Sequence, residues 1–167
     1  MTKRVSLATY LILALLAGCS RAGIAGPVAT ESSDPSRAAI ALMSYFRQLA
    51  DGEYREAASY YGGSYQILRD QNPPLDPNDN ARLFQQACEA NGYICLPVGE
   101  VVGIQEIGSG EYQISVQFIK PEGEVFVRGP CCGASEEEMS RQSTFEFRVA
   151  PDASGQYKVM DLPVYVP

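Results

Sequence analysis

Residues 39–61, AIALMSYFRQLADGEYREAASYY, decide which fold this chain can form. The first half carries apolar side chains at helical spacing, namely Ala39, Leu42, Met43, Phe46, Leu49 and Ala50. Asp34-Pro35 suits the start of this helix, and Asp51-Gly52 suits its end. Residues 53–61 indicate a second, short helix that stops at Gly62-Gly63. The stretch therefore predicts two consecutive helices, each with one buried side.

The chain between this helix pair and residue 97 predicts two further helical segments around a loop. Residues 64–70 favour a turn of helix, and residues 79–91 resume a helical pattern that ends at Gly92. Residues 72–78 contain three prolines, which lack an N–H and push the preceding residue out of the helical region. We therefore expect a loop there.

From residue 98 the apolar period changes to two. Expected strands are 101–107, 112–119, 124–128, 143–150 and 156–162, separated by turn-forming segments. In residues 112–118, YQISVQF, apolar and polar side chains alternate, so one face of this strand should be buried. Helices followed by a meander of such strands predict an α+β domain in which helices cover one face of an antiparallel sheet.

This order of elements, with YFRQLADGEYREAASYY at residues 45–61, resembles the nuclear transport factor 2-like superfamily, which includes SnoaL-like and cystatin-like proteins. The resemblance covers most of residues 34–162, although residues 72–97 depart from the minimal pattern. It implies N-terminal helices packed on a curved antiparallel sheet that wraps into a cone.

The N-terminus is similar to a bacterial lipoprotein signal peptide. Lys3-Arg4 precedes an apolar run at 5–17, and Leu16-Ala17-Gly18-Cys19 resembles a lipobox. The apolar run is too short to span a bilayer. The resemblance implies that residues 1–18 are removed and that Cys19 carries a diacylglyceryl group and palmitate-type acyl chains. An uncleaved anchor or a plain secreted product are the alternatives.

The expected organisation is then a signal at 1–18, a lipidated cysteine with a flexible tether at 19–33, and one α+β domain at 34–167. The tether is small, polar and punctuated by Gly and Pro. In a diderm bacterium, Ser20 after the modified cysteine is typical of a lipoprotein that is sorted to the outer membrane. In a monoderm the same signal implies the outer face of the plasma membrane.

Charge and composition exclude several classes of function. Loss of Lys3 and Arg4 with the signal leaves 11 basic residues against 20 acidic ones, a net charge of −9. Such a charge disfavours nucleic acid and electrostatic adhesion to anionic lipid as partners. The chain has no histidine, which removes Ser-His-Asp and Cys-His nucleophile arrangements and most transition-metal sites. We therefore expect no cofactor and no metal.

Four cysteines remain besides Cys19: Cys88, Cys95, Cys131 and Cys132. An even number in an oxidising compartment favours two disulfides, and three connectivities are possible. Pairing Cys88 with Cys95 leaves a strained vicinal pair, so we expect instead that both are linked to Cys131 and Cys132 across a longer loop. A zinc site or a thiol-exchange centre is disfavoured by the spacing.

The candidate ligand-binding residues are Arg128, Tyr60, Tyr61, Tyr65 and Tyr112. Arg128 ends a predicted strand beside a Gly/Pro turn and could bind a carboxylate or phosphate at the mouth of a cone. Its alternative role is a surface ion pair with one of the glutamates at 136–138. The tyrosines offer flat apolar faces with a polar tip, and their alternative role is the edge of the core.

These features favour a lipid-anchored binding or scaffolding module of the bacterial cell envelope over a catalyst. A small-ligand-binding protein predicts a cavity behind Phe46, Tyr112, Phe126 and Phe145. An assembly module that binds an envelope protein predicts a packed interior and an exposed apolar patch, for example the tail at 163–167. The superfamily's isomerase- and hydrolase-type enzymes, which act on small apolar substrates, are the other alternative. The residue types they would need are present as Asp70, Asp161, Tyr112 and Tyr157, without a matching motif.

Overall fold

The computed structural model describes residues 34–130, 132, 135 and 137–166. The signal, Cys19, the tether and Cys131 lie outside the described residues. Within the described part of the chain, no helix is long and apolar enough to cross a membrane.

Four helices form where the sequence predicts them. They are α1 (Asp34–Ala50), α2 (Tyr54–Tyr60), α3 (Gln66–Gln71) and α4 (Asn80–Glu89). The Asp79 side chain caps α4 by accepting a hydrogen bond from the backbone N–H of Arg82 at 3.0 Å. The four expected helical segments are thus confirmed to within a few residues at each end.

The buried side of α1 is rotated from the expected one. Its buried residues are Ala38, Ala41, Leu42, Tyr45, Phe46 and Leu49. Met43 is 44% exposed, and Ala50 also faces solvent. The expected stripe omitted Tyr45, whose ring is fully buried, and so it was centred too far toward Met43.

The strands form one antiparallel sheet in the order β1-β2-β3-β4. They are β1 (Val98–Gly108), β2 (Glu111–Phe118), β3 (Phe145–Pro151) and β4 (Tyr157–Val159). Buried and more exposed side chains alternate along β2 and β3, as their sequences predict. In the register of this pair, Ile114 lies opposite Phe147 and Val116 opposite Phe145, so the apolar side chains share one face.

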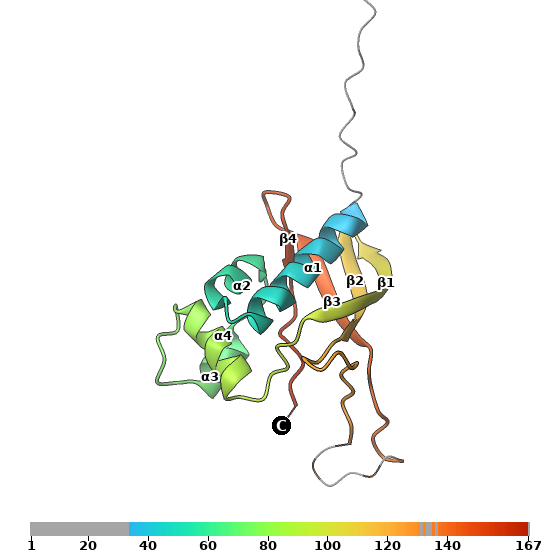
Figure 1. Cartoon of the computed structure of the whole chain (residues 1–167). Helices are drawn as coiled ribbons and strands as arrows, with labels where there is room; N and C mark the ends of the chain where they lie inside the picture. The colour runs from blue at the N-terminus through green and yellow to red at the C-terminus, as the bar shows by residue number, and fades with distance from the viewer. Residues whose placement is uncertain (1–33, 131, 133–134, 136, 167) are drawn as a thin grey trace, which may run out of the picture. The chain divides into compact units, whose positions relative to one another are not determined.

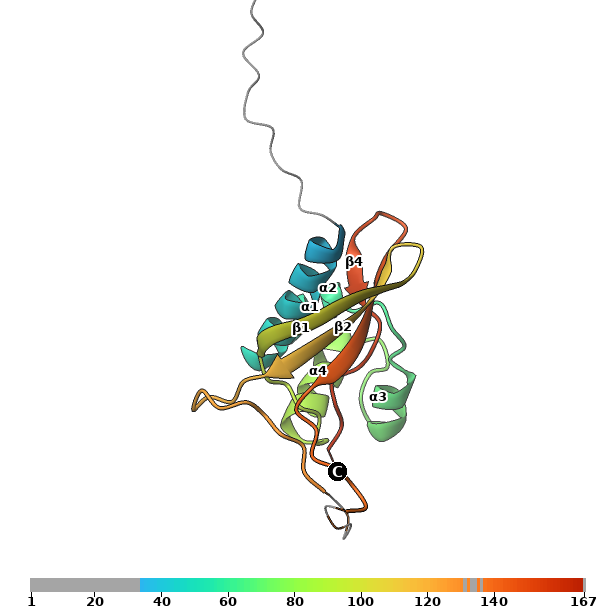
Figure 2. The same cartoon turned by 90° about the vertical axis from the view of Figure 1, so that its right-hand side faces the viewer.

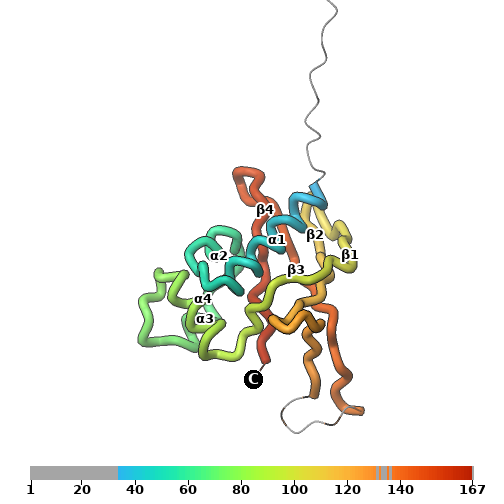
Figure 3. The backbone as a smooth tube through the Cα atoms, in the orientation of Figure 1, coloured from blue at the N-terminus to red at the C-terminus, as the bar shows by residue number. Residues whose placement is uncertain are grey.

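The expected strand at 124–128 was wrong. This segment makes only isolated bridges, between Ile119 and Val125 and between Arg128 and Gln142. A turn at residues 120–123 folds the chain back on the end of β2, where the Phe126 N–H donates to the Phe118 carbonyl at 2.9 Å. Beyond this short contact the two sides of the β2–β3 connection run beside each other, and the backbones of Arg128 and Gln142 bond to each other (Figures 1 and 3). Val125 and Val127 are each 44% exposed as a result.

Helix α1 lies across the apolar face of the sheet and contacts all four strands (Figures 1 and 2). Helix α2 packs against α1, α4 and β4, so the short helices adjoin the β4 side of this layer. Between the helices and the sheet is a core rich in aromatic residues, whose largest fully buried side chains include Tyr45, Phe46, Phe84 and Phe118. The α+β architecture with helices on one face of an antiparallel sheet is therefore confirmed.

The C-terminal tail pairs with the chain after α4. The Val166 N–H donates to the Gly92 carbonyl at 2.9 Å, and the Ile94 N–H donates to the Val164 carbonyl at 2.8 Å. Tyr165 forms an isolated antiparallel bridge with Tyr93 and is 46% exposed. The described residues of the tail, 163–166, therefore pair with the segment after α4 and not with the edge of the main sheet.

The preferred disulfide pattern was wrong for Cys88 and Cys95, which pair with each other. Cys88 lies in the last turn of α4, and the chain reverses at Gly92, whose φ of 78° is readily adopted by glycine. This reversal brings the two Cα atoms to 5.5 Å, within the range for a disulfide. Local geometry in the folded chain selects this pairing, although a longer loop would constrain the unfolded chain more.

Candidate functional site

The position expected for an internal cavity is occupied by aromatic rings. The ring centroid of Phe46 lies 4.7 Å from that of Phe118 and 4.8 Å from that of Phe147, both in edge-to-face geometry. Two further pairs, Phe126 with Phe145 and Tyr112 with Tyr157, each have centroids 5.9 Å apart. The phenylalanine rings form one continuous series of contacts, as in a packed core, and the two tyrosines form a separate pair. Tyr112 is thus a core residue.

Two of the other candidate tyrosines belong to ring contacts beside α4 that continue the same core, since Tyr45 meets Phe46 edge-on at 5.0 Å. Tyr61 stacks on Tyr45 with centroids 6.0 Å apart and meets Tyr65 edge-on at 4.9 Å. The Tyr61 hydroxyl donates to the Ser64 carbonyl at 3.0 Å. The hydroxyls of Tyr45 and Tyr65 are buried and have no hydrogen-bond partner among the described residues. Burial raises the pKa of Tyr45, Tyr61 and Tyr65, and it is reinforced by neighbouring phenols for Tyr45 and Tyr65 and first by the Asp161 carboxylate for Tyr61.

This cluster predicts a loss of stability at high pH. Above about pH 10 the unfolded tyrosines ionise while the buried ones stay neutral, so the unfolded state binds fewer protons and the free energy of unfolding falls as pH rises. The slope is at most about 1.4 kcal/mol per pH unit for each tyrosine that stays neutral. Urea unfolding at pH 8, 10 and 11 measures it. Tyr45→Phe should reduce the slope, and an unchanged slope in that variant would contradict this assignment.

The carboxylates considered for catalysis lie at the surface in hydrogen-bonded pairs. Asp161 accepts from the guanidinium Nη2 of Arg148 at 2.7 Å and from the backbone N–H of Arg148 at 2.7 Å. Asp70 is exposed and accepts from the side-chain amide of Gln66 at 2.7 Å. Neither carboxylate is enclosed in an apolar pocket, since Asp70 is exposed and Asp161 is only half-buried.

Arg128 lies at the base of the β2–β3 connection. It is half-buried, and its guanidinium donates to the side-chain oxygen of Gln142. The amide of Gln142 in turn donates to the Thr144 carbonyl at 2.9 Å. This neutral partner differs from the surface glutamates expected for a structural role of Arg128. Arg128, Gln142 and Thr144 line a cleft of about 450 Å³ that also contains Glu146, whose charge opposes binding of an anion.

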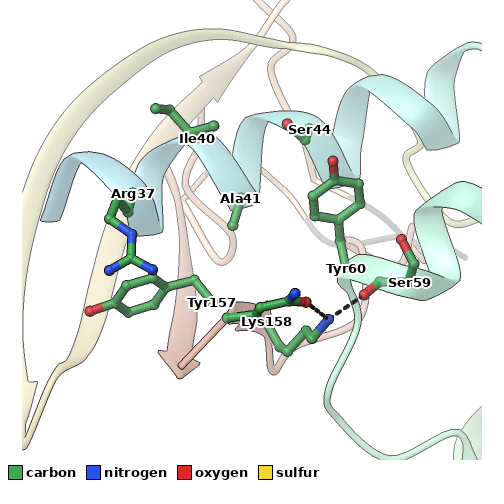
Figure 4. A pocket seen from close by; sticks show the side chains of 9 residues that line it. Arg37, Ile40, Ala41, Ser44, Ser59, Tyr60, Tyr157 and Lys158 are labelled. Carbon is green, nitrogen blue, oxygen red and sulfur yellow. Dashed lines mark hydrogen bonds between the residues drawn. The ribbon is translucent and has the colours of Figure 1, made fainter. Parts of the chain in front are cut away.

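Tyr60, the remaining candidate, lines a groove of about 560 Å³ between α1, α2 and β4 (Figure 4). The groove is lined by Arg37, Ile40, Ala41, Ser44, Ser59, Tyr60, Gln156, Tyr157 and Lys158. Its volume falls in the range of small-molecule sites. Tyr60 thus lies apart from Tyr61 and Tyr65, although the three are close in sequence.

Two cations hold the walls of this groove together. The Lys158 ammonium donates to the Ser59 carbonyl at 2.7 Å and so connects β4 to α2. The Arg37 guanidinium donates to the Gly155 carbonyl at 3.2 Å and lies 5.5 Å from the ring centroid of Tyr157, which connects α1 to the turn before β4. Each cation also meets an acid at the rim, since Arg37 is 3.2 Å from Asp34 and Lys158 is 3.6 Å from Asp152.

Sequence reasoning missed Arg37, Lys158 and Ile40 as members of one site. Arg37 and Ile40 belong to α1 and Lys158 belongs to β4, so they are far apart in the sequence. Within its own segment, each has the pattern of an ordinary surface residue. The available signal was Ile40 itself, which is apolar, falls outside the expected stripe of α1 and is 56% exposed.

No known protein family model matches the chain, and no curated protein is significantly similar to it in sequence. Within the described residues, no group of three or more Cys, Asp or Glu side chains is placed to hold a metal ion.

Proposed function

We propose that this protein is a lipid-anchored binding module of the bacterial cell envelope that holds its partner on the outer surface of the domain. The observation that carries the proposal is the contrast between a core packed with aromatic rings and an exposed groove beside α1. A packed interior leaves no room for a substrate or cargo among these rings, so recognition takes place on the groove. A nuclear transport factor 2-like fold is the superfamily consistent with the element order.

The outer side of α1 supports this location. Ile40 and Met43 are 56% and 44% exposed, and a second groove of about 440 Å³ on the other side of α1 is lined by both, with Pro97 and Val98. Apolar side chains gathered on one exposed helix face mark interaction surfaces more often than scattered ones do. The α1 face therefore supplies apolar contact area on both sides of Ile40.

Photo-crosslinking in the intact cell envelope tests the proposed location. A benzophenone amino acid replaces Tyr60, which lines the groove, and in a matched control it replaces Tyr165, an exposed tyrosine on the C-terminal tail. We expect a discrete crosslinked product from position 60 and none from position 165. Crosslinking only from position 165, or from neither position, would sink the proposed location.

The anchor is tested separately. Cys19→Ala removes the thiol that would carry the lipid, and two or more acyl chains are needed for stable attachment. We expect the variant to leave the membrane fraction and appear in the soluble extracytoplasmic fraction on immunoblotting. Continued attachment of the variant to the membrane would contradict lipidation at Cys19.

A further inference from the structure

We propose that the groove between α1, α2 and β4 binds a small anion, a carboxylate or phosphate on a flat apolar body. This inference rests on the proposed function and names the chemistry that the groove selects. The lining of the groove is positive, because it includes Arg37 and Lys158 and no carboxylate. The whole chain has 13 basic and 20 acidic residues, so a positive lining runs against the composition.

The two cations are held in place before a ligand arrives. Lys158 is fixed by the Ser59 carbonyl at 2.7 Å, and Arg37 by the Gly155 carbonyl and the ring of Tyr157. Lys158 also donates to the side-chain oxygen of Gln156 at 3.3 Å. The acids that pair with the two cations, Asp34 and Asp152, do not line the groove. An anion inside the groove therefore approaches each cation from the side away from its acid and shares that cation with it.

The remaining lining suits a flat apolar body. Figure 4 shows the Arg37 guanidinium beside the Tyr157 ring at one end of the groove, and the Lys158 ammonium near Ser59 toward the other. Ala41 and the ring of Tyr60 lie on the side of α1 and α2, and they offer an apolar surface and an aromatic face. The Ser44 hydroxyl adds a hydrogen-bonding group on the α1 side, whereas the Ser59 hydroxyl donates to the Glu56 carbonyl at 2.6 Å. Net negative charge keeps the protein off anionic membrane surfaces, whereas this local positive site takes up one small anion.

Three probes test the inference. Each is titrated into the full lipidated chain in phosphatidylcholine nanodiscs, and binding is measured by NMR. Benzoate and phenyl phosphate carry the two anionic groups, and benzamide is the neutral analogue of benzoate. We expect benzoate to bind at least about tenfold more tightly than benzamide. Tighter binding of phenyl phosphate than of benzoate would assign the site to phosphate monoesters, and the reverse order to carboxylates. Equal binding of benzamide and both anions, or binding of none of the three, overturns the inference.

Matched variants locate the binding. Arg37→Gln and Lys158→Gln should each weaken the binding of the better anion by about fivefold or more, and Lys158→Arg, which keeps the charge, should restore it. Lys120→Gln makes the same charge change in the turn after β2, outside both grooves beside α1, and should leave affinity unchanged. An equal loss in Lys120→Gln, or none in the two groove variants, contradicts the site. Crosslinking from position 60 is independent of these probes, so it separates failure of the anion inference from failure of the proposed function.

Discussion

Replacing Gly63 with alanine is expected to destabilise the domain by about 3 kcal/mol or more. A Cβ at this position would lie 2.2 Å from the Met160 carbonyl oxygen and 2.5 Å from the Tyr61 hydroxyl oxygen. The first of these atoms belongs to the backbone next to β4, so the clash cannot be relieved by turning a side chain. Chemical denaturation of the purified variant, or its failure to accumulate as folded protein, measures the effect.

Gly129 is the matched control for this substitution. A Cβ there would have no heavy atom within 4 Å, so Gly129→Ala should change the free energy of unfolding by less than about 0.5 kcal/mol. Equal stability of Gly63→Ala and the wild type would mean that α2 and β4 are not held as closely as described.

Phe46→Ala is expected to lower the free energy of unfolding by about 3–5 kcal/mol. Phe46 is fully buried, and its ring contacts both Phe118 and Phe147, so truncation removes apolar contacts and leaves a cavity between α1 and the sheet. Urea denaturation at neutral pH measures the loss.

Ile40→Ala on the same helix serves as the control, because Ile40 is 56% exposed and its truncation should cost less than about 0.5 kcal/mol. Similar losses for the two variants would contradict the assignment of the buried and exposed sides of α1.

The periodicity of the sequence predicted most of the secondary structure. Helix α1 begins at Asp34 with Pro35 in its first turn, and β2 alternates as its residues indicate, because both patterns reflect one buried face. The segment 124–128 carries three consecutive apolar residues, Val125, Phe126 and Val127, yet it makes only isolated bridges. Apolar content indicates that a segment can form a strand, whereas the length over which it pairs with β2 depends on the path of the chain after the turn at 120–123.

The candidate site could be predicted only in part. Tyr60 was identified for its chemistry, but Tyr61 and Tyr65 pack into the core beside Phe84. Tyr61 directly follows the end of α2 and therefore points in another direction than Tyr60, and Tyr65 lies at the start of the next helix. The cations of the groove depend on contacts between distant segments, such as Lys158 with Ser59. The Cys88–Cys95 pairing was likewise decided by the chain reversal after α4, which the sequence indicates only through Gly92.

The central claim is that the interior is filled and that binding takes place outside it. Crystals pressurised with xenon test this most directly, because xenon occupies dry apolar cavities large enough to hold it. We predict no xenon site among Phe46, Tyr112, Phe126 and Phe145 in the wild-type domain, and a new site in Phe46→Ala, which serves as the positive control. Xenon bound among these four residues in the wild type would show an open cavity there and contradict the account.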